Sequence, residues 1–389
     1  MVAERTRSAV GSPRRALLVA STGGKDASRG IRRRPDSSGG EGLDRGAARG
    51  ARRDLGAPAA DAFPDAAVTG APGTTRKARK RAGYDAIIVG GGPAGLSAAL
   101  ILGRCRRRVL VCDAGRPRNA ASRELHGFLT RDGVRPSELL AVGRRQLVKY
   151  GVEFVMGEVE DARRSRNGFD VRIAGGRPVF GRKLLFATGV VDRLPAVDGF
   201  RRLYGERIFH CPYCDGWEVS DRPLAVYGQG LSGMGLSLSL RTWSHDVTLV
   251  TDGPARLGSR ERRRLAGKGV EVVEKKIVRC ERRRGGLDVV FSDGDRLRRS
   301  ALFFSTGQDP SCDLPRRLGC RFTRKGAVKT NRLEGTGVPG LYVAGDASRA
   351  VQLAIVAAAE GAKAAFAMNV AIQEEEGLAV GIRGRNRLA

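Results

Sequence analysis

Two cysteines, Cys211 and Cys214, lie in the segment His-Cys-Pro-Tyr-Cys-Asp-Gly and can close a small disulfide. Thiols at this spacing favour redox exchange, especially at a helix start, where free N–H groups lower the thiol pKa and raise the thiolate fraction. Pro212 stiffens the turn, and Asp215 follows the pair and can donate or accept a proton. The segment therefore predicts a redox-active dithiol with an acid–base partner.

The same cysteine spacing also occurs at zinc sites and in purely structural pairs. Zinc needs four ligands, usually from a second close cysteine pair. The chain has seven cysteines and three histidines, but no other pair at this spacing. We therefore expect no metal, and a structural pair without a redox role stays as the alternative. The other cysteines lie singly and are interpreted as small buried or half-buried residues, which favours a reducing, cytoplasmic location.

A glycine-rich turn follows a short apolar strand and precedes a helix of small residues. Gly90 permits a tight turn, Gly92 lets a pyrophosphate approach the backbone, and Gly95 lets the helix pack closely on the strand. The helix N-terminus favours the phosphates. Asp113 ends the next strand, where a carboxylate can bind ribose hydroxyls. The pattern predicts a dinucleotide site, and the alternative is a glycine-rich turn that arose by chance.

A second turn of this kind contains Gly228, Gly230 and Gly233, and Asp252 stands at the end of its following strand. A carboxylate there repels a 2′-phosphate, so this turn taken alone predicts NADH rather than NADPH. The alternative is a domain that keeps the fold without binding a nucleotide.

Near the C-terminal end, Gly345 and Asp346 form a polar turn between a strand and a small-residue helix. The helix is predicted to run from Gln352 to about Met368. An acid at this turn can meet a cofactor hydroxyl, although an ordinary strand-to-helix turn would look similar.

Two strand–turn–helix–strand units position these residues. The chain of 389 residues is longer than a single core usually supports. The units predict an α/β fold with two Rossmann-like dinucleotide-binding domains. The first has strands at 85–89 and 108–112 around a helix at 93–103. The second has strands at 224–227 and 246–250, with a helix from the glycine turn to about Trp243.

The net charge is +29, from 70 Lys and Arg against 41 Asp and Glu. The basic residues are scattered and aromatic residues make up only 5% of the chain, so we interpret the charge as a solvated surface. Nucleic acid is not an expected partner. No run approaches the ~20 consecutive apolar residues of a membrane span, so no membrane is expected.

Residues 1–82 are rich in Gly, Ala, Arg, Ser and Pro and are predicted to be a disordered basic tail. The basic cluster from Arg76 to Arg81 could act as an electrostatic tether. The other interpretations are a non-functional extension and an arginine-rich transit peptide. A secretory signal is not expected, because the apolar run after Arg14 and Arg15 is too short.

These motifs, with Ala187-Thr188-Gly189 and Ser305-Thr306-Gly307, occur in the order found in the low-molecular-weight thioredoxin reductases. The segment from Tyr84 to about Gln373 resembles that family. The resemblance implies a discontinuous FAD domain, residues 84–196 and 307–373, into which an NAD(P)H domain is inserted. The insert, residues 197–306, would carry the dithiol, and residues 374–389 would form a C-terminal tail.

The resemblance also implies residue roles and partners. Thr188, Gly345, Asp346 and Gln352 would contact FAD. Hydride would pass from NADH or NADPH to the flavin, and the flavin would reduce the disulfide, with Cys214 nearer the ring. Cys211 would attack the partner disulfide while Asp215 supplies the proton. The substrate would be a thioredoxin-like protein or a small-molecule disulfide, and the enzyme would be a homodimer.

The chain departs from the family pattern in four places. Its second glycine turn ends in Gly233, where the family usually has alanine, and Pro212 and Tyr213 stand between the cysteines in place of the usual small residues. The NADPH-dependent members carry a His-Arg-Arg cluster after the second strand of the insert, where this chain has Thr251-Asp252-Gly253. They also carry an arginine before Gln352, where this chain has Val351.

Two alternative functions remain open at this stage. One is a dithiol oxidase that passes electrons from small-molecule thiols to oxygen. Such relatives often have histidine where Asp215 stands, so Asp215 favours the reductase. The other is a redox-sensing binding protein that docks on nucleic acid through residues 1–82.

Overall fold

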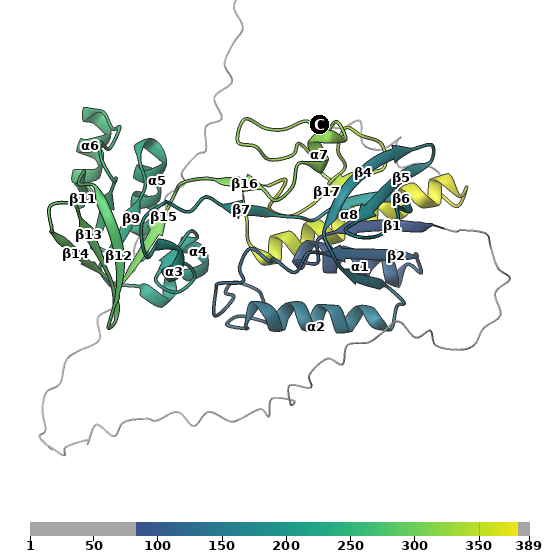
Figure 1. Ribbon diagram of the computed structural model, residues 1–389, viewed down its shortest axis with the longest axis horizontal. Coiled ribbons are helices and arrows are strands. Elements are labelled where there is room, and N and C mark those ends of the chain that lie inside the picture. The colour runs from purple at the N-terminus through teal and green to yellow at the C-terminus, as the bar shows by residue number, and fades with distance from the viewer. Residues whose placement is uncertain (1–82, 350, 380–389) are drawn as a thin grey trace, which may run out of the picture. The chain divides into compact units, whose positions relative to one another are not determined.

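The computed structural model describes residues 83–349 and 351–379, so the predictions for residues 1–82 lie outside the described residues. The first sheet has the strand order β3-β2-β1-β6-β5-β4, and β17 also pairs with β6 (Figure 1). Its strands are β1 (Tyr84–Val89), β2 (Val109–Asp113), β3 (Glu153–Met156), β4 (Val159–Ser165), β5 (Gly168–Ile173), β6 (Val179–Phe186) and β17 (Leu341–Val343).

Parallel pairing dominates the part of this sheet that carries the first glycine turn. The strands β3, β2, β1, β6 and β17 pair in parallel, whereas β4, β5 and β6 form an antiparallel meander. Parallel strands bring their carboxyl ends to one edge. The turns that follow β1, β6 and β17 therefore meet at the same edge of the sheet.

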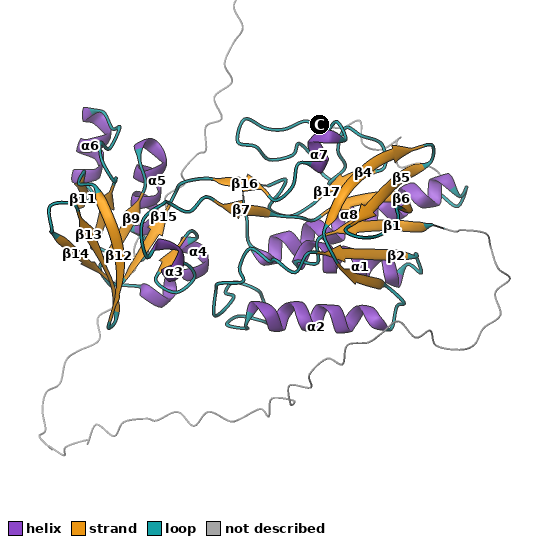
Figure 2. Cartoon of the chain, viewed as in Figure 1, coloured by secondary structure: helices purple, strands orange, loops and turns teal. Residues whose placement is uncertain are grey.

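Alternating side chains of β1 feed two apolar layers. Ala86 and Ile88 pack with the helices α1 (Pro93–Arg104), α2 (Pro136–Val148) and α8 (Ala354–Glu375), drawn in Figure 2. Ile87 points to the opposite layer, formed with β4, β5 and α7 (Leu314–Arg317). The strand is buried on both faces, which explains its uninterrupted apolar sequence.

The second sheet is entirely parallel, with the order β11-β10-β9-β15-β8. An antiparallel meander, β12-β13-β14, accompanies it. These elements are β8 (Ile208–Phe209), β9 (Leu224–Tyr227), β10 (Val247–Val250), β11 (Val270–Val273), β12 (Ile277–Arg283), β13 (Gly286–Phe291), β14 (Arg296–Arg299) and β15 (Ala301–Phe304). The helices of this part are α3 (Phe200–Leu203), α4 (Pro212–Asp215), α5 (Gly230–Leu240) and α6 (Ser259–Ala266), with the 3-10 turn η1 (Trp217–Val219).

In chain order, the second sheet lies between β6 and β17 of the first. The chain leaves through β7 (Val190–Asp192) and returns through β16 (Gln308–Pro310), and these two strands pair antiparallel with Asp192 opposite Gln308. The predicted α/β fold, with one dinucleotide-binding unit inserted in another, is confirmed. The domain limits set in the sequence analysis stay predictions.

Two helix ends differ from the sequence predictions. Helix α5 ends at Leu240 rather than near Trp243, because the N–H of Trp243 closes a turn on the Leu240 carbonyl. Helix α8 continues past Met368 to Glu375, into the predicted C-terminal tail. Ion pairs from Glu375 to Arg182 and Lys183 hold its last turn on β6.

Helix α8 is long and apolar enough to cross a membrane by length and composition alone. One of its faces is nevertheless part of the core, through Ala357, Ala364, Ala365 and Met368. The structure therefore accounts for its apolar sequence by packing against α1. The expectation that no membrane is involved stays a prediction.

Replacing Gly361 with valine should lower the free energy of unfolding by ~1–3 kcal/mol. A Cβ at Gly361 would overlap the carbonyl oxygen of Ala94, so α8 would have to move away from α1. Chemical denaturation measures the change, with Ala359→Val on the exposed face of the same helix as control. Equal effects of the two substitutions would contradict the packing account.

Candidate active site

Cys211 and Cys214 are joined by a disulfide at the start of α4, with their Cα atoms 5.3 Å apart. The backbone N–H groups of Cys214 and Asp215 both donate to the carbonyl oxygen of Cys211, each over 3.2 Å. Pro212 occupies the first helical position, where its fixed φ suits the helix and its missing N–H costs nothing. This single turn brings the predicted pair together in its oxidised form.

Asp215 is half-buried directly after the pair. Burial raises the pKa of its carboxyl to about 7, the negative charge of Glu218 acts in the same direction, and His126 opposes them. A carboxyl that titrates near neutral pH can both lose and regain a proton there. Its environment therefore suits the acid–base role predicted from the sequence.

His210, beside Cys211, was not singled out by the sequence analysis. Its Nδ1 lies 3.3 Å from the hydroxyl oxygen of Tyr204 and 3.8 Å from Asp192 Oδ2. Burial lowers the pKa of His210 to about 4, the positive charge of Arg118 adds to this, and Asp192 opposes it. The imidazole next to the dithiol is therefore neutral at physiological pH.

The first glycine turn has the geometry that its sequence predicts. Gly90 has φ +108°, and a Cβ at Gly95 would overlap the Gly90 carbonyl, so α1 contacts the end of β1 directly. A Cβ at Gly92, by contrast, would meet nothing within 4 Å. Packing does not demand a glycine at position 92, whereas a pyrophosphate approaching the backbone would. This turn therefore fits the FAD that the family resemblance implies.

Asp113 ends β2, and its Oδ2 would lie 2.7 Å from a Cβ at Gly91, so the carboxylate lies against the glycine turn. Arg144 on α2 donates from Nη2 to the same oxygen over 2.8 Å, and its guanidinium carbon lies 4.9 Å from the Phe154 ring centroid. The Arg144 Nε is buried and has no hydrogen-bond partner among the described residues. Arg144 could not be predicted from the sequence, because it lies on a helix 31 residues after Asp113 and belongs to no motif.

Thr188 and Gly345 converge on the same edge of the sheet. The backbone nitrogen of Thr188 would lie 3.2 Å from a Cβ at Gly90. Gly345 has φ +79°, and its N–H donates to Glu360 Oε2 over 2.8 Å. Asp346 and Gln352 are brought together through one partner, because both accept hydrogen bonds from Nη1 of Arg118.

In the second glycine turn, Gly228 and Gly233 also pack too closely for side chains, and Gly230 has φ +56°. The Gly230 N–H, however, donates to the Ala255 carbonyl over 2.8 Å. The side-chain amide of Gln229 donates to the Thr251 carbonyl, also over 2.8 Å. These bonds tie the turn to the segment after β10.

Asp252, predicted to bind a nucleotide ribose, lies after β10 with φ +51°. Its carboxylate accepts the Ile277 N–H over 2.9 Å and the Tyr227 hydroxyl over 3.1 Å, and it pairs with Lys276 at 3.0 Å. These contacts engage the Asp252 carboxylate with other residues of the inserted part, and the hydroxyl groups of a ribose would have to displace them to bind it.

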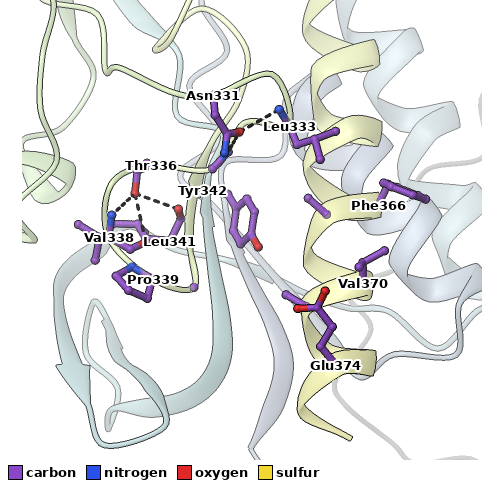
Figure 3. Close-up of a pocket in the computed structure, with 14 residues that line it drawn as sticks. Asn331, Leu333, Thr336, Val338, Pro339, Leu341, Tyr342, Phe366, Val370 and Glu374 are labelled. Carbon is purple, nitrogen blue, oxygen red and sulfur yellow. Dashed lines mark hydrogen bonds between the residues drawn. The ribbon is translucent and has the colours of Figure 1, made fainter. Parts of the chain in front are cut away.

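Among the residues that the structure describes, no group of three or more His, Cys, Asp or Glu side chains could hold a metal ion. A cavity of about 380 Å³ lies between α8 and the loop before β17, and Figure 3 shows Tyr342, Phe366 and Glu374 around it. None of the predicted site residues lines this cavity. It is separate from the redox site.

Aromatic side chains surround the dithiol turn. Tyr213 and Trp217 are 73% and 81% exposed, and the Tyr213 ring meets Trp243 edge to face at 5.5 Å. The chain contains only two tryptophans, and both lie in this region. An exposed aromatic surface beside a reactive disulfide is suited to contact a partner molecule.

Two dinucleotide-type folds with a disulfide-bonded cysteine pair in the inserted one define the class of flavin-dependent disulfide oxidoreductases. The family model of the pyridine nucleotide-disulphide oxidoreductases matches residues 84–361. This chain belongs to that family. It is a thioredoxin-reductase-like flavoprotein, and its family binds FAD and a pyridine nucleotide.

Individual relatives agree with this assignment. A probable thioredoxin reductase of Arthroderma benhamiae is 31% identical over 75% of this chain and 81% of its own length. The crystal structure of HlmI is 38% identical, with a TM-score of 0.73 over 76% of this chain and 94% of that one. A putative thioredoxin reductase, TrxB from Bacillus anthracis, is 30% identical, with a TM-score of 0.71 over 75% of this chain and 99% of that one.

The pH dependence of disulfide reduction should report the Asp215 carboxyl. Because its pKa is about 7, the rate should fall as the pH rises through 7 and the proton donor is lost. Asp215→Asn should remove this alkaline limb, whereas Asp221→Asn, at a nearby exposed carboxylate, should keep it. Initial rates measured on both sides of pH 7 check this, and a limb that persists in Asp215→Asn would assign the titration to another group.

Nucleotide preference should depend little on Asp252. Because its carboxylate is engaged with Ile277 and Lys276, Asp252→Asn should change the NADH to NADPH ratio of kcat/KM by less than about threefold, or ~0.7 kcal/mol. The free energy of unfolding should fall by ~0.5–1 kcal/mol. Steady-state kinetics with both nucleotides and chemical denaturation test this, with Asp293→Asn as control. A tenfold or larger shift toward NADPH would show that Asp252 faces the ribose.

Proposed function

We propose that this enzyme reduces the disulfide of a thioredoxin-like protein with electrons from NADH or NADPH. The observation that carries the proposal is the Cys211–Cys214 disulfide, followed by a carboxyl whose pKa is about 7. The exposed rings of Tyr213 and Trp217 support a protein partner, because aromatic residues are enriched where proteins dock. The names of the thioredoxin reductase relatives support the same substrate class.

The exchange balances with one cysteine as nucleophile and one as resolving thiol. The Cys211 thiolate attacks a sulfur of the partner disulfide, that bond breaks, and a mixed disulfide forms. The leaving thiolate takes the proton of Asp215. The Asp215 carboxylate then accepts the proton of the Cys214 thiol, and the resulting thiolate attacks Cys211. This step restores the internal disulfide and releases the second partner sulfur as a thiolate, which takes a proton from water.

The Gly90–Gly95 turn would hold FAD, which would supply the electron pair that reduces the Cys211–Cys214 disulfide, and a pyridine nucleotide would provide that pair as hydride. The chain's own contribution is to hold the sulfurs in one turn and to keep a protonated carboxyl beside them. Neutral His210 adds no positive charge next to Cys211.

Three features favour a second candidate, a dithiol oxidase that takes electrons from small-molecule thiols and delivers them to oxygen. The second glycine turn donates its Gly230 N–H to Ala255, Asp252 is engaged internally, and no His-Arg-Arg cluster follows β10. Each feature removes a group that could bind a pyridine nucleotide. Electrons would then enter through the dithiol rather than through NAD(P)H.

Anaerobic mixing separates the two candidates. The reductase predicts that NADH or NADPH bleaches the flavin absorbance, whereas the oxidase predicts bleaching by a dithiol only.

Cys211→Ser and Cys214→Ser should each lower disulfide turnover by at least ~10³-fold, because no second thiol can replace the missing one. Both should retain FAD, and Cys105→Ser, at an exposed free cysteine, is the control. Loss of FAD from both serine variants would point instead to a structural pair.

We also propose a homodimer in a reducing cytoplasm. Free thiols at Cys112, Cys280, Cys312 and Cys320 support the reducing compartment, and the described residues contain no second disulfide. Cys105 differs from the sequence prediction, because it is exposed in the turn after α1 rather than buried. The dimer rests on the family resemblance, and sedimentation of the FAD-loaded enzyme tests it.

A further inference from the structure

Arg118, in the loop after β2, has a side chain that is only 14% exposed and a guanidinium with four side-chain partners. Its Nε and Nη2 form a bidentate pair with Asp192, at 3.0 and 2.6 Å. Its Nη1 donates to Asp346 at 2.8 Å and to Gln352 at 2.7 Å, and Nη2 also donates to Gln308 at 3.2 Å. Because all three nitrogens of the guanidinium donate hydrogen bonds, the Arg118 side chain is held in one orientation.

The partners of Arg118 belong to two functional regions. Asp346 and Gln352 are the residues that the family resemblance assigns to FAD. Asp192 and Gln308 lie opposite each other on β7 and β16, through which the chain leaves for the inserted part and returns from it. One guanidinium therefore joins the cofactor residues to both connecting strands.

The contacts continue from Asp192 to the dithiol turn. The Tyr204 hydroxyl donates to Asp192 Oδ2 over 2.7 Å, and His210 Nδ1 lies 3.3 Å from the same hydroxyl oxygen. Because the hydroxyl proton is directed at Asp192, a hydrogen bond with His210 requires the proton on Nδ1. His210 precedes Cys211, so the contacts reach from the cofactor residues to the neighbour of the redox disulfide.

The residue before Gln352 supplies no charge, because it is Val351, whose side chain is 59% exposed. Arg118 brings a guanidinium to Gln352 from a loop far away in the sequence. We propose that Arg118 is a positioning residue for the redox reaction, which orients Asp346 and Gln352 for FAD and couples them through Asp192 to His210 beside the dithiol.

The negative charges of Asp192 and Asp346 explain why a neutral residue could not replace Arg118. The side chains of Asp192 and Asp346 are 6% and 18% exposed, and Arg118 is the cation that pairs with both. Without it, two carboxylates would share a poorly solvated site, and each would disfavour ionisation of the other. A lysine keeps the charge but cannot form the bidentate pair with Asp192 while also reaching Gln352.

Loss of Arg118 should also alter the titration of His210. Asp192, Tyr204 and Arg118 are the charged and titratable groups around this imidazole. Burial and the charge of Arg118 lower the pKa of His210, and Asp192 raises it. Removing the cation leaves burial alone to oppose Asp192, so the pKa of His210 should rise, and the acid limb of a rate that depends on this imidazole should move to higher pH.

The test compares Arg118→Met and Arg118→Lys with Arg116→Met, a matched control in the same loop whose side chain is 71% exposed. FAD affinity is measured by flavin fluorescence on refolded or flavin-stripped protein. Arg118→Met should bind FAD at least ~10-fold more weakly, the scale of one lost charged hydrogen bond, and Arg118→Lys should recover part of the loss. Wild-type affinity in Arg118→Met would overturn the proposal.

Asp192→Asn tests the coupling without touching a residue assigned to FAD, and it keeps the fold testable if Arg118→Met does not fold. The proposal expects weaker FAD binding in Asp192→Asn, because Arg118 then loses its bidentate partner. Unchanged affinity would overturn the coupling.

The pH profile of disulfide reduction by NADH or NADPH supplies a readout that a merely structural arginine would not move. On acidification, the rate of Arg118→Met should begin to fall at a higher pH than the rate of the wild-type enzyme. An equal pH for the two proteins would overturn the link to His210. The inference deepens the proposed function and rests on it only for this kinetic readout. FAD affinity requires no disulfide substrate, so the two ideas can fail separately.

Discussion

Backbone contacts among β1, α1 and α8 set the geometry of the first sheet and of the turns at its edge. Gly95 lets α1 touch the end of β1, and Gly361 lets α8 touch α1 at Ala94. Gly345, after β17, packs against Ala94 from the same side, with its Cβ position 3.2 Å from the Ala94 Cβ. Because side chains are absent at these contacts, the backbone itself sets the spacing, and the turns for a cofactor meet at one edge of the sheet.

Arginine has two different functions in this basic chain. Most arginine side chains within residues 83–349 and 351–379 are exposed to solvent, as the scattered sequence distribution indicates. A few neutralise carboxylates that the fold removes from water. Arg349 pairs with fully buried Glu334 and with Glu360, which in turn accepts the Gly345 N–H. Arg118 pairs with Asp192 and Asp346 in the same manner. Buried ion pairs of this kind hold a site in one geometry, since removing one partner leaves an uncompensated charge.

The groups beside the disulfide have their protonation set by burial. Asp215 is pushed toward its neutral form, with a pKa of about 7, and His210 is held neutral by a pKa of about 4. The Asp215 carboxyl therefore titrates in the pH range where thiols exchange with disulfides, whereas the His210 imidazole does not. The local sequence supplies both residue types, but their protonation depends on what the fold packs around them.

Features that depend on neighbouring residues could be predicted from the sequence. Glycine spacing after an apolar strand predicts a strand–turn–helix unit, and the C-x-x-C segment predicts a disulfide that one helical turn closes. The tertiary structure decided the contacts between residues distant in sequence. Arg118 meets Gln352, Arg144 meets Asp113, and Asp252 turns toward Ile277. No local pattern encodes such pairs, because a side chain's partner depends on how strands and helices far apart in the chain pack together.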